Sequence, residues 1–151
     1  MSHLKLGHVH LKVSSLSRAV GFYSGILGLK VTEEVSGIFA FLSSSELHHE
    51  LALQQVGEGA PAPSPRSLGL YHVAFEVADR QALARMYRKI RDNNIHVIAV
   101  DHRISWALYF SDPDGNGLEI YTDMRSQPGG ARMWEGKTRE LTPAEILAHE
   151  G

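Results

Sequence analysis

The residues best suited to chemistry in this sequence are histidines and one glutamate. Nine of the 151 residues are histidine and none is cysteine, so any metal ligand must come from His, Asp or Glu. His8 and His72 begin predicted strands at equivalent places in two similar stretches of sequence, and Glu119 lies on a third predicted strand, on the face opposite its apolar residues. Two neutral imidazoles and one carboxylate on one side of a metal, with the other side open, are typical of a non-haem Fe(II) site that binds both a chelating substrate and dioxygen.

Each of these residues alone has a simpler explanation. A single histidine on a strand face is more often a hydrogen-bonded or surface residue than a metal ligand. Taken together, two repeat-related imidazoles and an inward carboxylate are a costly set of buried polar groups unless a cation compensates them. The sequence therefore predicts a metal site formed by His8, His72 and Glu119.

The elements that must position these residues are repeated along the chain. The first copy is predicted to be one strand, one helix and three further strands, at residues 6–13, 16–27, 30–35, 37–42 and 48–56. The second copy has the same order, with a strand at 70–77, a helix between Asp79 and Asn93, and strands at about 95–101, 106–110 and 118–122. The predicted fold is therefore α+β, with two βαβββ modules paired into an open, cupped barrel.

Proline and glycine mark the boundaries of these modules. Three prolines fall within five residues between Gly57 and Leu68, a composition that suits a linker and neither a helix nor a central strand. Thr142 and Glu145 form a predicted capping box for a short helix near the C-terminus, where the tail is expected to be a cover or a dimer contact. We expect a single domain, 1–151, made of a first module at 4–56, a linker at 57–68, a second module at 69–123 and a tail at 124–151.

Composition and charge narrow the class of partner. The chain has 15 Lys and Arg against 17 Asp and Glu, a formal net charge of −2 with neither sign in blocks, so nucleic acid and anionic membranes are not expected partners. No apolar run approaches the roughly 18 residues of a membrane span, and residues 1–6 carry no signal-peptide pattern. Together with the absence of cysteine, these features predict a cytoplasmic protein.

The opening strand and a later turn resemble a known family. Leu6-Gly7-His8-Val9-His10-Leu11-Lys12-Val13, the two βαβββ copies and Asp112-Pro113-Asp114-Gly115 are similar to segments of the vicinal oxygen chelate superfamily, over roughly residues 4–123. Within this region one stretch is similar to the extradiol ring-cleavage dioxygenase signature, through the spacing of His102, Leu108-Tyr109, Asp112-Pro113, Gly115 and Glu119.

The resemblance implies a reaction and a role for the matching residues. It makes His8, His72 and Glu119 the ligands of Fe(II), with Mn(II) as an alternative, and it places His102 and Tyr109 beside the substrate hydroxyl and the metal-bound oxygen. The implied reaction is the cleavage of a catechol-type diol by O2 to a ring-opened semialdehyde. Two-domain members hold the iron in their C-terminal domain, and this chain resembles that domain alone.

Residues 49 and 50 separate this function from a competing one. The segment His48-His49-Glu50-Leu51-Ala52 resembles the motif whose second histidine is the acid–base residue of the dioxygenases, which gives His49 that role. Glyoxalase I and related isomerases instead use four metal ligands, which in this chain would be His8, Glu50, His72 and Glu119. Strand alternation puts His49 and Glu50 on opposite faces, so only one of them can face the metal unless a bulge intervenes.

A second alternative function is the binding of a small molecule without catalysis. Proteins similar to the bleomycin-resistance proteins bind a small molecule without a metal, and they lack the His, His and Glu set. His10 and Trp106 are candidates for contacts behind the ligands or with the substrate, although a structural role is the simpler explanation for both. We expect a homodimer or a larger homo-oligomer, and the repeat leaves open whether the modules pair within one chain or between chains.

Overall fold

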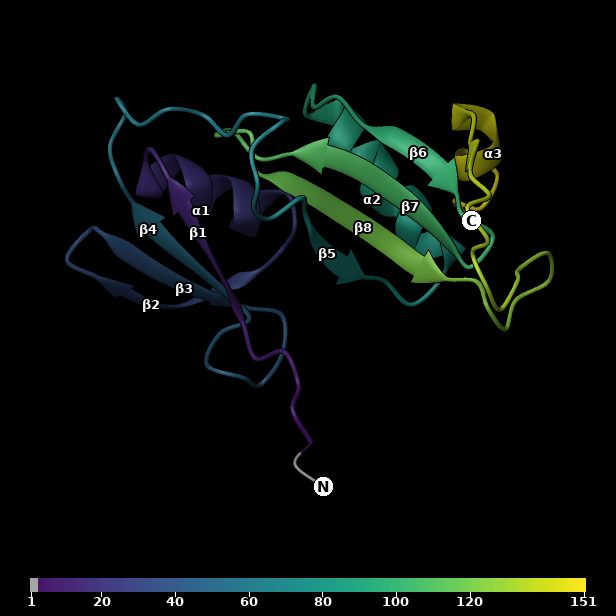
Figure 1. Ribbon diagram of the computed structural model, residues 1–151, viewed down its shortest axis with the longest axis horizontal. Helices are drawn as coiled ribbons and strands as arrows, with labels where there is room; N and C mark the ends of the chain where they lie inside the picture. The colour runs from purple at the N-terminus through teal and green to yellow at the C-terminus, as the bar shows by residue number, and fades with distance from the viewer. Residues whose placement is uncertain (1–2) are drawn as a thin grey trace. The chain divides into compact units, whose positions relative to one another are not determined.

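The computed structural model describes residues 3–151, and these form two compact units (Figure 1). The first unit is the chain up to Ser67 together with Asp112–Asn116, and the second is Leu68–Ser111 together with Gly117–Gly151. Each unit contains one mixed β-sheet and a main helix that packs on one of its faces. The predicted α+β fold of two βαβββ modules is confirmed.

The first unit follows the predicted order of one strand, one helix and three strands. Its elements are β1 (Val9–Val13), α1 (Leu16–Gly25), β2 (Lys30–Val35), β3 (Phe39–Ser43) and β4 (Leu51–Gln55). The sheet order is β1-β4-β3-β2, with β1 parallel to β4 and the other pairs antiparallel. Alternation along β1 is as predicted, because Leu11 and Val13 are buried whereas His10 and Lys12 are exposed. The polar side chains of β1 therefore lie on the open face of the sheet.

A buried carboxylate connects helix α1 to the turn at Asp112–Asn116. The fully buried Tyr23 donates a hydrogen bond from its hydroxyl to Asp112 Oδ2 at 2.8 Å. The backbone N–H groups of Asp114 and Asn116 both donate to Asp112 Oδ1 at 2.9 Å. Burial, followed by the charge of Asp112, raises the pKa of Tyr23, which keeps the phenol protonated as the donor. Every carboxylate oxygen of Asp112 is thus engaged in holding the turn.

The second unit repeats the order of the first and adds a C-terminal extension. Its elements are β5 (Val73–Glu76), α2 (Arg80–Asp92), β6 (Ile98–Asp101), β7 (Ser105–Ser111), β8 (Gly117–Asp123), β9 (Arg139–Glu140) and α3 (Pro143–Leu147). The sheet order is β5-β8-β7-β6-β9, with β5 parallel to β8. Asp79 caps α2 by accepting a hydrogen bond from the backbone N–H of Ala82, and the helix buries Leu83 and Ile90.

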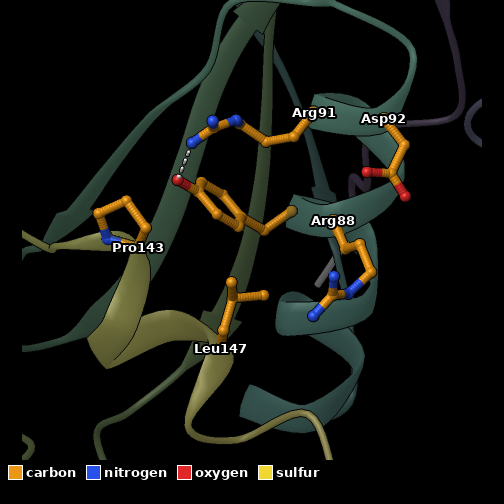
Figure 2. Close-up of a pocket in the computed structure, with 6 residues that line it drawn as sticks. Arg88, Arg91, Asp92, Pro143 and Leu147 are labelled. Carbon is orange, nitrogen blue, oxygen red and sulfur yellow. Dashed lines mark hydrogen bonds between the residues drawn. The ribbon is translucent and has the colours of Figure 1, made fainter.

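The short helix α3 packs on α2, and Figure 2 shows the groove beside the two helices. The capping box of Thr142 and Glu145 is present as predicted. The groove is lined by Tyr87, Arg88, Arg91, Asp92, Pro143 and Leu147. Arg91 donates to the hydroxyl of Tyr87 at 3.1 Å, as the dashed line in Figure 2 indicates. This groove lies beside α2, whose contacts with β7 and β8 cover the apolar face of the second sheet.

Several element boundaries differ from the sequence prediction. Strands β1 and β5 begin one residue after His8 and His72, so both histidines lie just outside their strands at equivalent places in the two units. Strand β4 begins at Leu51 and not at residue 48, and β9 was not predicted. Within residues 3–151, no helix is long and apolar enough to cross a membrane.

Candidate functional site

A hydrogen-bonded pair across β7 and β8 forms the centre of the candidate site in the second unit. Tyr109 lies directly opposite Glu119 in the antiparallel register, and its hydroxyl donates to Glu119 Oε1 at 3.0 Å. Glu119 is only 8% exposed, as expected for an inward carboxylate. Burial, followed by the charge of Glu119, raises the pKa of Tyr109, so its hydroxyl keeps the proton that it donates.

His72 meets the other oxygen of the same carboxylate. The distance between His72 Nε2 and Glu119 Oε2 is 2.8 Å, and the His72 side chain is 27% exposed. Gly117, at the start of β8, makes this approach possible, because a Cβ there would lie 2.3 Å from the carbonyl oxygen of Tyr71 and 3.4 Å from His72 Cβ. The other ring nitrogen, His72 Nδ1, is buried and has no hydrogen-bond partner among the described residues.

His102 lies in the turn between β6 and β7 and contacts Tyr109 from there. Its Nε2 lies 2.9 Å from the Tyr109 hydroxyl oxygen and its Nδ1 lies 2.7 Å from Thr138 Oγ1. The turn is closed by a hydrogen bond from the backbone N–H of His102 to the carbonyl of Ser105. The second unit therefore connects His102, Tyr109, Glu119 and His72 in one continuous polar chain.

The first unit brings His8 and His49 together. Their ring centroids are 4.5 Å apart, and the ring centroid of Phe41 lies 4.9 Å from that of His49. Burial, followed by the charges of His8, His48 and His10, lowers the pKa of His49. His8 itself is exposed, so the expectation of a wholly buried ligand set is met at Glu119 and partly at His72, but not at His8.

The side chain of Glu50 points toward a neighbouring loop that contains several serines. Its Oε2 accepts hydrogen bonds from the backbone N–H and the hydroxyl of Ser44, both at 2.7 Å, and its Oε1 accepts one from the hydroxyl of Ser45 at 3.1 Å. The hydrogen bonds from Ser44 lower the pKa of Glu50. Glu50 and His49 therefore have different partners, although both lie before the start of β4 and not in the predicted strand, and the carboxylate is engaged within its own loop.

Similarity to known proteins identifies the family of this chain. Residues 5–120 match the model of the Glyoxalase/Bleomycin resistance protein/Dioxygenase superfamily. The chain belongs to this superfamily. The match covers the first βαβββ module, the second as far as the middle of β8, and all the candidate residues from His8 to Glu119.

Three relatives within the superfamily differ in their named activities. The chain is 33% identical to catechol-2,3-dioxygenase of Bacillus subtilis (strain 168) over 118 residues, 78% of this chain and 41% of that protein. It is 33% identical to biphenyl-2,3-diol 1,2-dioxygenase 3 of Rhodococcus globerulus over 126 residues, 82% of this chain and 66% of that protein. A metallothiol transferase, FosB of Staphylococcus saprophyticus, is 28% identical over 78% of this chain and 76% of that protein. The chain thus spans less than two thirds of the two dioxygenases.

Solved structures of the superfamily share the architecture. A glyoxalase/dioxygenase from Nostoc punctiforme has a TM-score of 0.64 and 28% identity, covering 79% of this chain and 90% of that one. A domain from Frankia sp. EAN1pec has a TM-score of 0.69 at 20% identity, covering 81% of this chain and 99% of that one. These likenesses support the vicinal oxygen chelate fold, which hosts several chemistries in the superfamily.

Two of the predicted supporting residues lie apart from these groups. Trp106 is on the face of β7 opposite Tyr109, where its ring contacts Arg80 and His149. This placement favours the structural role for Trp106 over a substrate contact. His10 is exposed on the open face of the first sheet, with its ring 6.1 Å from that of Phe39.

Sequence reasoning missed three residues that contact the predicted ones. Thr138 and Trp134, from the tail, lie against His102, and Glu33 lies 3.1 Å from His48 Nε2. No motif marks these positions, because they act through single side-chain contacts with one another or with a histidine, in irregular structure or at an exposed strand edge. Among residues 3–151, no group of three His, Asp or Glu side chains within either unit is arranged to hold a metal ion.

Proposed function

We propose that this protein is a non-haem Fe(II) enzyme that cleaves a catechol-type aromatic diol with O2 to a ring-opened semialdehyde. The observation that carries the proposal is the polar chain from His102 through Tyr109 and Glu119 to His72, which joins the residues that this reaction requires in the second unit. Similarity to two ring-cleavage dioxygenases at 33% identity supports it. A homo-oligomeric state and a cytoplasmic location stay predictions.

The proposed metal ligands are His8, His72 and Glu119. Two imidazoles and a carboxylate are a suitable donor set for Fe(II), and Mn(II) has similar preferences. His72 Nε2 and Glu119 Oε2 already face each other at 2.8 Å, and His8 is the residue of the first unit that the repeat makes equivalent to His72. Bound Fe(II) would supply one centre at which the diol and dioxygen are held as neighbours, so that their reaction needs no chance encounter in water.

His49 is the proposed acid–base residue. It would accept a proton from a diol hydroxyl and return it later in the reaction, and an imidazole suits both steps because its ordinary pKa of about 6.5 is close to neutrality. Its Nδ1 lies 2.8 Å from Nδ1 of His48, whose Nε2 is 3.1 Å from Glu33. The atom proposed to exchange the substrate proton is therefore Nε2 of His49.

Tyr109 and His102 are proposed to act beside the diol oxygens. Tyr109 keeps its proton on the bond to Glu119 Oε1, and the other oxygen, Oε2, which faces His72 Nε2, is the proposed donor to the metal. His102 holds the Tyr109 hydroxyl from the other side, at 2.9 Å. Groups placed in this way would stabilise negative charge that develops on substrate oxygen.

The four-ligand isomerase is the main alternative, and it requires the Glu50 carboxylate. That carboxylate accepts hydrogen bonds from Ser44 and Ser45 in the first unit. Releasing it to a metal would break these hydrogen bonds to Ser44 and Ser45, whose donors are exposed and would bond to water instead. The contacts of Glu50 therefore favour the three-ligand ring-cleavage function.

The test is anaerobic reconstitution with Fe(II), or in a parallel sample with Mn(II), followed by oxygen and a panel of catechols. We expect oxygen uptake matched by formation of a coloured ring-opened semialdehyde. The same protein is also offered a hemithioacetal without oxygen. Isomerisation of that compound together with no catechol-dependent oxygen uptake would replace the proposed reaction with isomerase chemistry.

A further inference from the structure

The tail after β8 reaches back to the turn that carries His102. Its path is fixed by backbone hydrogen bonds, because the N–H of Met124 donates to the carbonyl of Ile104 and the N–H of Ala131 donates to the carbonyl of Arg103. Gly130 is required in this path, since a Cβ there would lie 1.6 Å from the carbonyl oxygen of Met124. The tail is therefore anchored on both residues that follow His102.

Two side chains of this anchored tail contact His102. Thr138 Oγ1 lies 2.7 Å from His102 Nδ1, and Trp134 Nε1 donates to the same Thr138 Oγ1 at 3.1 Å. The Trp134 ring also stands edge-on to the imidazole, with centroids 5.8 Å apart and an interplanar angle of 88°. His102 is thus held at Nδ1 by the tail and at Nε2 by Tyr109.

The direction of each hydrogen bond follows from the groups at the two ends of this chain. At one end the Tyr109 hydroxyl donates to Glu119 Oε1, so the single proton of Tyr109 is committed to that contact. The contact between Tyr109 and His102 therefore needs its proton from His102 Nε2. A neutral imidazole with a proton on Nε2 has an unprotonated Nδ1, which must accept from Thr138.

The contacts at the other end are compatible with the same arrangement. The indole N–H of Trp134 can only donate, so it occupies a lone pair of Thr138 Oγ1 and leaves the hydroxyl proton of Thr138 available for His102 Nδ1. Every donor then points toward Glu119, with no two protons and no two lone pairs facing each other. Hydrogen bonds that all run in one direction polarise one another, and each bond is stronger as a result.

We propose that Thr138 and Trp134 are positioning residues that hold His102 as the neutral tautomer protonated at Nε2, with this N–H directed at the Tyr109 hydroxyl. The inference rests on the proposed function only for the role of His102 in turnover. The tautomer itself is a property of the protein before any metal or substrate binds. Neither the ring-cleavage signature nor the superfamily match, which ends at residue 120, includes these two tail residues.

The experiment is nitrogen-15 NMR of imidazole-labelled, metal-free protein at a pH at which His102 is neutral, with His102→Gln to assign the signal. We expect the wild-type spectrum to show His102 with a proton on Nε2 and a bare, hydrogen-bonded Nδ1. Thr138→Val removes the donor and shifts the Nδ1 signal, whereas Thr138→Ser keeps the hydroxyl and restores the wild-type signal. A proton on Nδ1 in the wild type, or identical spectra for the valine and serine variants, would overturn the proposal.

A kinetic comparison of the same variants adds a second readout. Outer contacts of active-site histidines are worth about 10–100-fold in activity, so we expect Thr138→Val to lower kcat about tenfold with KM changed by less than about twofold. Thr138→Ser is expected to retain the kcat of the wild type. The expected NMR shifts in a protein that consumes no catechol would reject the dioxygenase function and leave the positioning role intact. Conversely, unchanged kcat in Thr138→Val would contradict a role of Thr138 in turnover.

Discussion

At the scale of single residues, hydrogen-bonding capacity separates the roles of His49 and Glu50. The carboxylate of Glu50 finds several hydroxyl and N–H donors on the adjacent serine loop, whereas the imidazole of His49 packs against the ring of His8. A carboxylate that accepts several hydrogen bonds is stabilised in its ionised form where it lies. The contacts of Glu50 are therefore those of a structural side chain, and His49 stays the proposed residue for proton transfer.

His49→Ala tests the second half of this assignment. We expect the variant to bind iron as the wild type does but to turn over at least about a hundredfold more slowly, because general acid–base assistance is worth that much. The measurements are iron content after anaerobic reconstitution and kcat for the best catechol. Glu50→Gln is the matched control, with iron content and kcat close to those of the wild type. Loss of iron from His49→Ala would make His49 a ligand.

The stability contribution of Glu50 is expected to depend on pH in a defined direction. Its pKa in the folded protein lies below the ordinary value of 4.5, so the unfolded chain binds the proton more readily. The contribution is therefore complete above about pH 4.5 and is lost as the pH falls through the lowered folded-state pKa. The measurement is the free energy of unfolding of wild type and Glu50→Gln between pH 7 and pH 3 by urea titration. We expect their difference to shrink with acidification, and a difference that grew would contradict the bonding seen at Ser44.

At the scale of elements, one glycine decides how closely β8 and the segment before β5 can pack. A Cβ at Gly117 would meet the Tyr71 carbonyl oxygen at 2.3 Å, and a backbone atom cannot move aside as a flexible side chain can. Gly117→Ala is expected to lower the free energy of unfolding by about 1–3 kcal/mol, the usual cost of overpacking. It should also weaken iron binding, because it moves His72 relative to Glu119.

The control for this substitution is Gly59→Ala, since a Cβ at Gly59 would meet no atom within 4 Å. We expect its unfolding free energy to match that of the wild type within about 0.5 kcal/mol, as for most exposed positions. The measurements are chemical denaturation and the apparent Kd for Fe(II) under anaerobic conditions. Equal stability of the two glycine variants would show that β8 and the segment before β5 tolerate a wider separation.

Periodic side-chain patterns made most of these elements predictable from the sequence. Alternation identified β1, helical spacing and capping residues identified α2 and α3, and the repeat placed His8 and His72 at equivalent positions. The pattern failed where side-chain hydrogen bonds replace periodicity. The serine loop that holds Glu50 moves the start of β4 to Leu51, and the tail that carries Thr138 has no repeating pattern to reveal its contact with His102.

At the scale of the whole molecule, the proposed ligand set takes residues from both copies of the repeat. The second unit provides His72 and Glu119 with their donor atoms 2.8 Å apart, and the first provides His8 at the equivalent place before its first strand. Neither unit contains three suitable side chains of its own in a metal-binding arrangement among residues 3–151. The proposed ligand set therefore predicts that iron binding depends on residues of both units.

This dependence predicts that a substitution in either unit removes the same ion. We expect His8→Ala and His72→Ala each to lose stoichiometric iron, measured by elemental analysis after anaerobic reconstitution, whereas His10→Ala keeps it. A ligand that binds only the folded state stabilises it by about 2.7 kcal/mol when present at 100 times its Kd. Fe(II) should accordingly raise the Tm of the wild type and of His10→Ala, and should leave the Tm of both ligand variants unchanged. If His8→Ala retained both the iron and the rise in Tm, His8 would not be a ligand, and His72 and Glu119 would need a different third partner.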